Sequence, residues 1–299
     1  MKRVLSALFL ASLVFAVVAQ AGEKSPVDQG SVRHYFRPHS GVIEESNGLD
    51  NSGVERRRGI NLTYHGGPVI LSAKVVFIFW GPSFSNAASP DFQYAQTLIA
   101  FRNQFGTTPE FNVITQYYQN LGSGNQFIAL TNLGSGTPDL FDTSTPPTNV
   151  TDAIVQGEVN AYLASHAFDA STIYEVVIPS SSYSSDGGGT SCGGPALQYC
   201  AYHGFFNSGS NAVKYSIEPY PSCGGCQVAG WTAVQNQEHF VCHETREAVT
   251  DQQLNAWFDS RGAEADDKCA WSPTPFIGTG GYSYQYEWSN AVTNCVQTR

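Results

Sequence analysis

The sequence predicts an α+β fold, in which helices pack on a mixed β-sheet and one long helix carries a candidate site. Two continuous apolar runs, residues 73–81 and 171–179, are typical of buried strands. Helix start signals lie between and after these runs. A polar segment over residues 231–254 has helical spacing and contains two histidines and several acids. We therefore expect a single α+β domain over residues 59–299.

The first 58 residues carry signals for export and none for the core. A basic start, an apolar run and the small-residue site Ala19-Gln20-Ala21 predict a secretory signal peptide over residues 1–21. The alternative, a membrane anchor, is disfavoured by the short apolar run. Residues 22–58 are polar and lack periodicity, so we expect a flexible leader or propeptide. Its end, Arg56-Arg57-Arg58, is either a processing site or a solvated linker.

The charge balance is acidic. The chain has 15 basic and 25 acidic residues, and removal of the predicted signal leaves 13 basic residues and a net charge of −12. Nucleic-acid binding needs clustered Lys and Arg, so no nucleic-acid partner is expected. We expect a secreted, extracellular protein with no membrane association after signal cleavage.

All seven cysteines lie between Cys192 and Cys295. In an oxidising compartment most of them should pair, which predicts three bridges and one free thiol without fixing the connectivity. Cys223-Gly-Gly-Cys226 is a C-x-x-C, which is either redox-active, half of a zinc clip, or part of structural disulfides. Export favours structural disulfides, so we expect a disulfide-rich C-terminal half.

Helix and strand signals alternate in the first half of the domain. Ser89-Pro90-Asp91 combines a cap, a proline and an acid, and predicts a helix that ends at Gly106. Residues 108–110 repeat this start signal for a second helix. Residues 125–133 read as a strand, and Asn149-Val150-Thr151 is expected to cap a third helix.

The second half begins with a Ser- and Gly-rich stretch, residues 180–195, which we expect to be a loop. Residues 198–206 and 213–219 read as two strands that could pair with each other. The long helix follows over residues 231–254. Near the C-terminus aromatic residues alternate from Tyr282 to Trp288, which predicts a half-buried strand.

The long helix contains a variant of a zinc-protease motif. Residues four apart lie on one helical face, which gives a stripe of four potential ligands: His239, His243, Glu247 and Asp251. His243 and Glu247 have the spacing of the two ligands in HExxH, with Glu in place of the second His. Glu244 follows His243, where that motif has the glutamate that acts on the metal-bound water. The spacing predicts a zincin-like Zn²⁺ site with Glu244 as the catalytic residue; the alternative is an ordinary charged helix.

A third zinc ligand is expected from the acids that follow the helix. Glu264 and Asp267 are the candidates, although a turn of solvated acids is an alternative for each of them. Calcium is possible as a structural ion on Asp251, Asp259, Glu264 and Asp267, but His243 would be a poor ligand for it. An inverted H-x-x-E-H motif is excluded because Cys242 stands where the glutamate would be. His203, on the predicted strand 198–206, either approaches this site or is a satisfied, half-buried histidine, and the second is expected.

Several stretches together resemble a known family: NLTYHGGPVI, CAYHGFF, SCGGC, EAVTDQQLNAWFDSRGAEADDKC and YEWSNAVTNC. Over about residues 60–295 the chain resembles secreted microbial proteins that are distantly similar to plant Exordium, or phosphate-induced protein 1. The microbial members carry HExxE, then T-D, then G-x-E-x-x-D-x-C. The matching residues here are His243, Glu244, Glu247, Glu264, Asp267 and Cys269. Asp266 replaces the usual glycine and Gln252 the usual proline. The resemblance implies fold and export more than a reaction.

Two functions of different class are therefore expected. The first is a secreted zinc-dependent peptidase, or zincin-like relative, that hydrolyses peptide bonds of a polypeptide substrate. The alternative is a non-catalytic extracellular protein of the Exordium kind, which binds cell-wall carbohydrate or a receptor through exposed Tyr and Trp. A tight ion pair of Glu244 with Arg246 or Lys268 would favour the binding protein.

Overall fold

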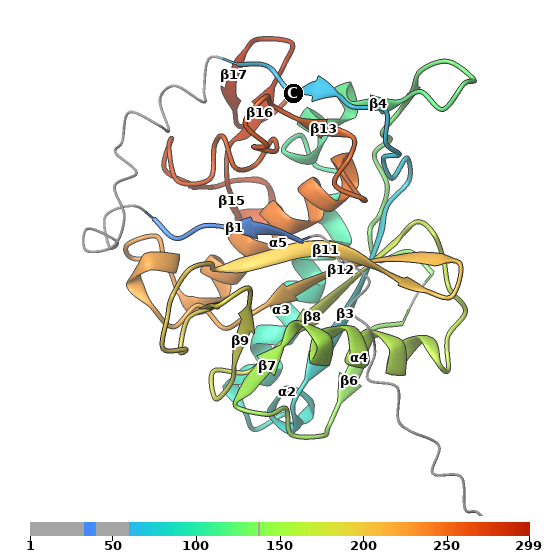
Figure 1. The fold of residues 1–299 in the computed structure, drawn as a ribbon. Coiled ribbons are helices and arrows are strands. Elements are labelled where there is room, and N and C mark those ends of the chain that lie inside the picture. The colour runs from blue at the N-terminus through green and yellow to red at the C-terminus, as the bar shows by residue number, and fades with distance from the viewer. Residues whose placement is uncertain (1–32, 40–59, 137) are drawn as a thin grey trace, which may run out of the picture. The chain divides into compact units, whose positions relative to one another are not determined.

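The computed structural model describes residues 33–39, 60–136 and 138–299 (Figure 1). They form an α+β fold with a six-stranded mixed sheet in the order β1-β11-β12-β8-β3-β6, as expected. The predicted signal peptide, the basic run at 56–58 and the rest of the leader outside 33–39 lie outside the described residues. No helix in the described part of the chain is long and apolar enough to span a bilayer.

The two apolar runs form the centre of the sheet. They become β3 (Lys74–Trp80) and β8 (Thr172–Val177), which pair in parallel. β6 (Leu140–Asp142) and β12 (Asn211–Glu218) add in parallel on either side. Every residue of β8 is buried, because both faces of the sheet are covered, which explains the continuous apolar pattern.

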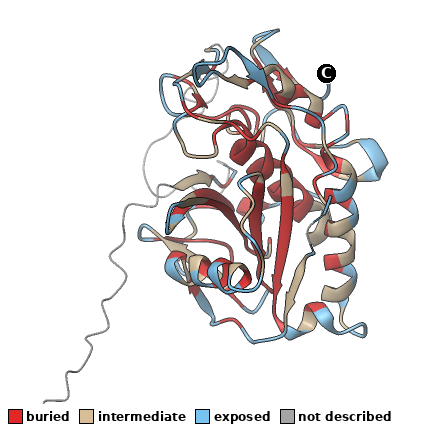
Figure 2. Cartoon of the chain, turned by 90° about the vertical axis from the view of Figure 1, so that its right-hand side faces the viewer, coloured by how far each residue is buried: buried red, intermediate tan, exposed pale blue. Residues whose placement is uncertain are grey.

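Helices cover the two faces of the sheet. On one face α3 (Pro90–Phe105) and α5 (Ala233–Thr250) pack against alternate residues of β3. On the other face α4 (Asp152–Leu163) packs against the intervening residues. Figure 2 shows buried residues throughout the central strands and helices. The cap signal at Ser89 is confirmed: its hydroxyl accepts from the Asp91 N–H at 3.2 Å, and α3 ends at Gly106. α4 follows Thr151 as expected, but the Thr151 side chain makes no cap hydrogen bond.

Two expected elements of the first half are wrong in kind. The helix expected after residues 108–110 is a 3₁₀ helix, η2 (Phe111–Gln116), followed by β4 (Tyr118–Gln119). The strand expected over 125–133 shrinks to β5 (Gln126–Phe127). Its remaining backbone bonds to separate loops instead of a ladder: Ala129 N–H donates to the carbonyl of Leu71 at 2.9 Å, and Thr131 N–H to that of Gly106 at 3.0 Å.

The Ser- and Gly-rich stretch is not only a loop. It contains β9 (Tyr183–Asp186) and β10 (Gly189–Thr190), which form a three-stranded sheet with β7 (Asn149–Thr151). The turn between β9 and β10 is possible because Gly187 and Gly188 adopt φ values of 56° and 88°.

The next two predicted strands are confirmed as a hairpin. β11 (Ala201–Ser208) pairs antiparallel with β12. The aromatic C-terminal stretch divides into two short strands, β15 (Ser283–Tyr284) and β16 (Glu287–Ser289). The remaining short elements are α2 (Pro82–Ser85), β2 (Thr63–Tyr64), η3 (Gly224–Cys226), β13 (Trp257–Phe258), β14 (Phe276–Ile277), η4 (Thr279–Gly281) and β17 (Asn294–Val296).

Part of the expected leader belongs to the sheet. Residues 33–36 form β1 (Arg33–Phe36), which pairs antiparallel with β11, and Phe36 is fully buried. The expectation that residues 22–58 stay outside the core is therefore wrong for this segment. The polar sequence concealed the strand because its side chains find polar partners on both faces of the sheet.

Six of the seven cysteines form three disulfides, as expected. The pairs are Cys192–Cys223, Cys200–Cys226 and Cys269–Cys295, and Cys242 is a buried free thiol in α5. The two cysteines of the C-x-x-C bond to different partners, so they are structural. The first two bridges tie the loop after β12 to the start of β11 and the loop before it.

Candidate functional site

α5 is buried although much of its surface is polar. It begins with a capping box, in which the Thr232 hydroxyl accepts from the Gln235 N–H at 3.3 Å and the Gln235 side chain accepts from the Thr232 N–H at 2.9 Å. Every residue from Asn236 to Thr250 is buried. A buried polar side chain needs a partner, so the helix must be enclosed by other polar groups or by a ligand.

The predicted stripe along α5 divides into a centre and two ends. In the centre, Nε2 of His243 lies 3.2 Å from Oε2 of Glu247. At one end, Nε2 of His239 is 2.8 Å from the side-chain oxygen of Gln285. At the other end, Oδ1 of Asp251 accepts from the backbone N–H groups of Asn255 and Ala256, both at 2.6 Å. His239 Nδ1 and Asp251 Oδ2 remain without a hydrogen-bond partner, but among the described residues only the centre of the stripe belongs to groups of three potential ligands.

The structure gathers the predicted ligands around Glu247. Its carboxylate, His243 Nε2 or Nδ1 and an Asp267 oxygen offer ligand atoms within 4.8 Å of one another. Glu264 belongs to a second such group with Glu247 and His34. The backbone N–H of Asp267 also donates to Oε1 of Glu247 at 3.0 Å, which leaves Oε2 for another partner.

Two histidines of this cluster lie outside the predicted ligand set. His203 on β11 was expected to be satisfied, but its Nε2 has no hydrogen-bond partner and lies 3.5 Å from Glu247 Oε2 and 3.6 Å from Glu264 Oε2. His34 on β1, the register partner of His203, lies with Nε2 2.6 Å from Asp267 Oδ2. Both come from strands remote from α5 in sequence. The only local signal for His203 is its place in the C-A-Y-H-G stretch of the resemblance.

Four atoms of the cluster are buried without a hydrogen-bond partner among the described residues. They are Nε2 of His203, Nε2 of His243, Oε2 of Glu247 and Oε2 of Glu264. Glu247 Oε2 lies 3.2 Å from His243 Nε2 and 3.5 Å from His203 Nε2, which lies 3.6 Å from Glu264 Oε2; these three of the six separations are close to the edge of a zinc coordination tetrahedron. Bonds of about 2.0–2.1 Å from zinc to nitrogen or oxygen place neighbouring ligand atoms about 3.3 Å apart. These three separations are therefore compatible with a small cation between the atoms.

Gln285 sets the chemical form of His243. Its amide nitrogen donates to the carbonyl and to Oδ1 of Asp266, at 2.9 and 2.7 Å, so its oxygen faces α5. That oxygen accepts only, and it lies 3.2 Å from Nδ1 of His243. Nδ1 must therefore carry the hydrogen, and Nε2 is the nitrogen available to a metal.

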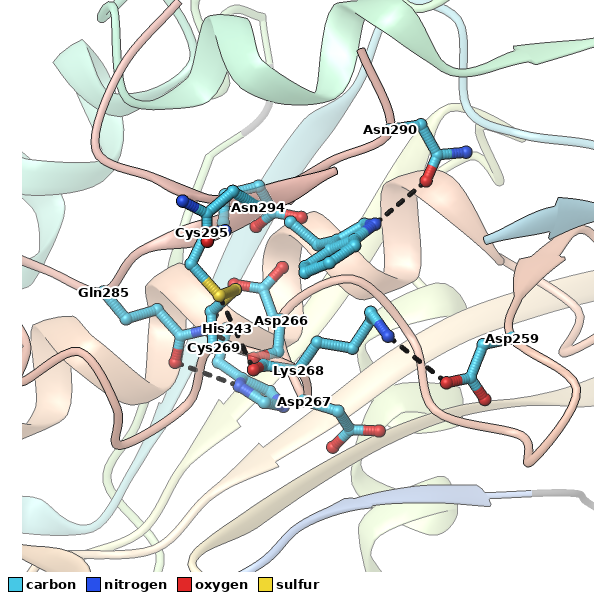
Figure 3. The surroundings of a disulfide bond; sticks show 12 residues. His243, Asp259, Asp266, Asp267, Lys268, Cys269, Gln285, Asn290, Asn294 and Cys295 are labelled. Carbon is cyan, nitrogen blue, oxygen red and sulfur yellow. Dashed lines mark hydrogen bonds and ion pairs between the residues drawn. A yellow bond between two sulfur atoms is a disulfide. The ribbon is translucent and has the colours of Figure 1, made fainter. Parts of the chain in front are cut away.

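The segment that carries Glu264 and Asp267 is fixed from several sides. Arg246 of α5 forms buried ion pairs with Asp266 and, at 2.8 Å, with Glu287. The disulfide Cys269–Cys295 ties the end of the segment to β17. Figure 3 shows this disulfide close to His243, Asp267 and Gln285. Asp266 thus holds the segment that carries the two candidate ligands, Glu264 and Asp267.

Glu244 faces the cluster and makes no ion pair with the two cations that could have neutralised it. Both of its oxygens are buried without a hydrogen-bond partner in the described chain. Arg246 pairs with Asp266 and Glu287, while Lys268 lies 3.3 Å from Asp259. Glu244 offers a ligand atom within 4.8 Å of atoms of His203 and Glu247. Glu244 therefore lacks the tight ion pair with Arg246 or Lys268 that would have favoured the binding protein.

The acids of the cluster repel one another. Burial raises the pKa of Glu244 well above its ordinary value, and Glu218 and Glu247 raise it further. Burial raises the pKa of Glu264 in the same way, although His34 opposes the shift. For Glu247, burial is outweighed by His243 and His203, and its pKa is well below the usual range. A divalent cation would relieve this repulsion and keep the acids ionised.

The acids named for a calcium site do not come together. Asp251 caps a turn, and Asp259 pairs with Lys268 and accepts the backbone N–H of Arg261 at 2.8 Å. Among the described residues, neither belongs to a group of three ligands. Glu264 and Asp267 remain in the cluster with the histidines, which is the donor set of a transition metal.

Comparisons of the chain with models of protein families, with curated proteins and with solved structures give no match. The chemistry of the site is therefore argued from its own geometry.

Proposed function

We propose that the chain is a secreted zinc-dependent peptidase with a zincin-like helix. In this proposal His243, Glu247 and His203 hold Zn²⁺, water takes the fourth position that a catalytic zinc site keeps open, and Glu264 and Asp267 lie beside the metal. One observation carries the proposal: Nε2 of His243, Nε2 of His203, Oε2 of Glu247 and Oε2 of Glu264 are buried and lack hydrogen-bond partners, and three separations of 3.2–3.6 Å connect them. Burying such atoms without a ligand would cost several kcal/mol for each charge, on the order given for unpaired buried ions.

The donor set favours zinc over calcium. Two imidazole nitrogens and a carboxylate oxygen match the three protein ligands of a catalytic zinc site, whose fourth position is taken by water. Calcium takes about six to eight oxygen ligands in a flexible geometry, so two imidazole nitrogens are poor ligands for it. Gln285 adds the outer-shell hydrogen bond that is usual for a metal-bound histidine.

Glu244 is the residue that would move protons. A bound zinc ion lowers the pKa of a water ligand and polarises a peptide carbonyl. Beside it, the unpartnered carboxylate of Glu244 would accept the proton of the attacking water and return it to the leaving nitrogen. Its position directly after His243 places it next to the three proposed ligands.

The alternative is a non-catalytic extracellular protein that binds carbohydrate or a receptor in the Exordium manner. It was expected to use exposed Tyr and Trp side chains. In residues 33–39, 60–136 and 138–299 every Tyr and Trp is buried or half-buried, so this support for the alternative is missing.

Metal analysis of the purified full-length chain tests the proposal. After dialysis, wild type should retain about one zinc per chain, and His203→Ala and His243→Ala should lose most of it. His166→Ala is the matched control, because His166 stacks on Tyr162 and is in none of the ligand groups. Equal zinc content in all four proteins would refute the site. Zinc retention without hydrolysis of any peptide in a mixed library would leave a metal-binding protein and refute the peptidase.

A further inference from the structure

β1 occupies the edge of the sheet next to the candidate site. It pairs antiparallel with β11, with Arg33 opposite Gly204 and Phe36 opposite Ala201. The segment that follows is held by backbone bonds: His39 N–H donates to the carbonyl of Gly225 at 2.7 Å. Figure 1 shows β1 beside β11 and close to α5. β1 is therefore an added strand, and the sheet would end at β11 without it.

One face of β1 enters the site. His34 Nε2 lies 2.6 Å from Asp267 Oδ2, and its Nδ1 lies 3.4 Å from Glu264 Oε1. His34, Glu247 and Glu264 form one of the groups that offer ligand atoms within 4.8 Å of one another. β1 thus brings a further imidazole to the carboxylates of the proposed zinc site.

Two residues later, Phe36 fills an aromatic pocket beside the site. Its ring stacks on His243 with centroids 4.1 Å apart, and on Trp271 at 5.1 Å. It also meets His239 and Phe240 edge-on. The four aromatic rings around Phe36 come from α5 and from Trp271, and none comes from β1. Another aromatic side chain can therefore take the place of Phe36.

The other face of β1 is recognised by acids. Arg33 pairs with Asp186 and, at 2.9 Å, with Asp152, and the Tyr35 hydroxyl donates to Asp186. Side chains alternate along a strand, so Arg33 and Tyr35 lie on one face of β1, and His34 and Phe36 lie on the other. Both faces of this extended segment are therefore in contact with the domain. The surface around the β11 edge therefore suits an extended segment with a basic residue first, any residue second, and aromatic residues third and fourth.

With β1 in place, the proposed ligands are closed off from solvent. The side chains of His243 and Glu247 are 0% exposed and that of His203 is 1% exposed. The exposed parts of the cluster are His34 at 22% and Asp267 at 14%. A polypeptide cannot reach Glu244 while β1 stays on the edge, so β1 must leave before a substrate can bind.

We infer that β1 is an intramolecular occupant of the substrate strip: it pairs with the edge of β11, caps the metal site with His34, and is replaced by an extended polypeptide that carries a basic residue followed, two and three positions later, by aromatic residues. This inference rests on the proposed function and adds to it a substrate class and a means of keeping the chain latent. Main-chain pairing with β11 supplies affinity, and the acidic and aromatic contacts supply specificity, as in other cases of strand addition to a sheet edge.

A peptide with the sequence of residues 33–39 tests the strip on metal-free protein. Fluorescence anisotropy with the labelled peptide should show weak binding to the wild-type full-length chain, because its own β1 competes. The full-length double variant Arg33→Ala, Phe36→Ala should bind the peptide at least tenfold tighter. A peptide with alanine at those two positions should not bind. Equal binding of the peptide to wild type and to the variant would overturn the inference.

Hydrogen exchange on wild type covers the case in which the double variant does not fold. Amides of β1 should exchange at least tenfold faster than those of the central strand β12, because β1 must detach while the domain stays folded. If the β1 amides exchange as slowly as those of β12, the inference is overturned, because β1 would then detach only when the whole domain unfolds.

A third measurement separates the role of His34 from the existence of the site. In the Co²⁺-loaded chain, His34→Ala should change the visible absorption of the metal, and His39→Ala, an exposed histidine of the same segment, should not. Identical spectra for His34→Ala and wild type would overturn the capping role while leaving the proposed function standing. A wild-type chain that binds no metal would refute the proposed function and the capping role, and the peptide would still decide whether the β11 edge accepts a strand.

Discussion

The side-chain oxygen of Gln285 lies 3.2 Å from Nδ1 of His243, and this contact decides which nitrogen of the ring faces Glu247. The amide is itself held by Asp266, which is paired with Arg246. A chain of three buried contacts therefore links the orientation of a proposed ligand to the ion pair between Arg246 and Asp266. Such outer contacts control metal affinity without touching the metal.

Replacing Gln285 should weaken the site without removing a ligand. Gln285→Ala loses the acceptor of the Nδ1 hydrogen, and we expect zinc affinity to fall roughly 10–100-fold, as is usual for outer-shell changes. Competition with a fluorescent zinc chelator measures this. Gln126→Ala, at an exposed glutamine on β5, is the control. Unchanged affinity in Gln285→Ala would show that His243 is oriented by something else.

Glu244→Gln separates the catalytic residue from the ligands. The amide keeps the shape of the carboxylate but cannot take a proton, so zinc content should be unchanged and peptide hydrolysis should fall by about 10²–10⁴-fold. Zinc analysis and a peptidase assay on one preparation measure both. Glu158→Gln, at a buried acid of α4 that faces the other core, is the matched control. Loss of zinc in Glu244→Gln would make this residue a ligand.

Glu247 should be the most sensitive position of the site, because each of the three groups that contain α5 residues includes it. Glu247→Ala removes a ligand, so affinity should fall by more than the roughly 10–100-fold of an outer-shell change. Glu247→His restores HExxH and should retain zinc, since imidazole also ligates zinc at this spacing. The same zinc content in wild type and Glu247→Ala would mean that the motif is an ordinary helix.

Glu175 should make the metal-free domain less stable as pH rises. This acid of β8 is fully buried and accepts a hydrogen bond from the Thr245 hydroxyl at 2.6 Å. Burial raises its pKa from 4.5 to about 8. Between those values the folded state holds a proton that the unfolded state has lost, so its contribution to the unfolding free energy falls as pH rises from about 4.5 to about 8.

Glu175→Gln removes that titration. Urea unfolding at pH 5 and pH 8.5 measures the unfolding free energy of both proteins. The difference, variant minus wild type, should be roughly 2–4 kcal/mol larger at pH 8.5 than at pH 5, an order-of-magnitude figure from the shift in pKa. A stability difference that is the same at both pH values would argue against a neutral Glu175.

Thiol counting checks the cysteines. Under denaturing, non-reducing conditions one thiol per chain should react, that of Cys242, because the other six are paired. The same protein should react only slowly when folded, since the thiol is buried and burial raises its pKa to about 12. Five or more reactive thiols in the denatured chain would contradict the pairing.

The parts of the fold that the sequence predicts are those with local causes. β3 and β8 follow from continuous apolar runs, and α3 follows from Ser89 and its proline. The 3₁₀ helix η2 and the short β5 differ from expectation because their backbone groups bond to distant loops, which no local pattern records. β1 was missed because a polar strand can be stabilised by polar partners on both faces.

The site shows the same division. His243, Glu244 and Glu247 follow from helical spacing alone, and the acids after the helix follow from proximity along the chain. His203, His34 and Gln285 come from strands and a C-terminal segment, and only the sheet order brings them to α5. The burial of α5 was also hidden, because its polar residues are of the kind that usually faces water.

The enclosure of α5 has a consequence for how the gene can vary. In most domains, apolar positions tolerate least change and polar ones accept many substitutions. Along residues 236–250 every side chain is enclosed, and ten of the fifteen are polar. A saturation mutagenesis library selected for folded protein should therefore show this helix as a continuous intolerant band. Its charged and amide positions should be as restricted as the valines beside them, so drift in this gene would be confined to the loops and the outer strands.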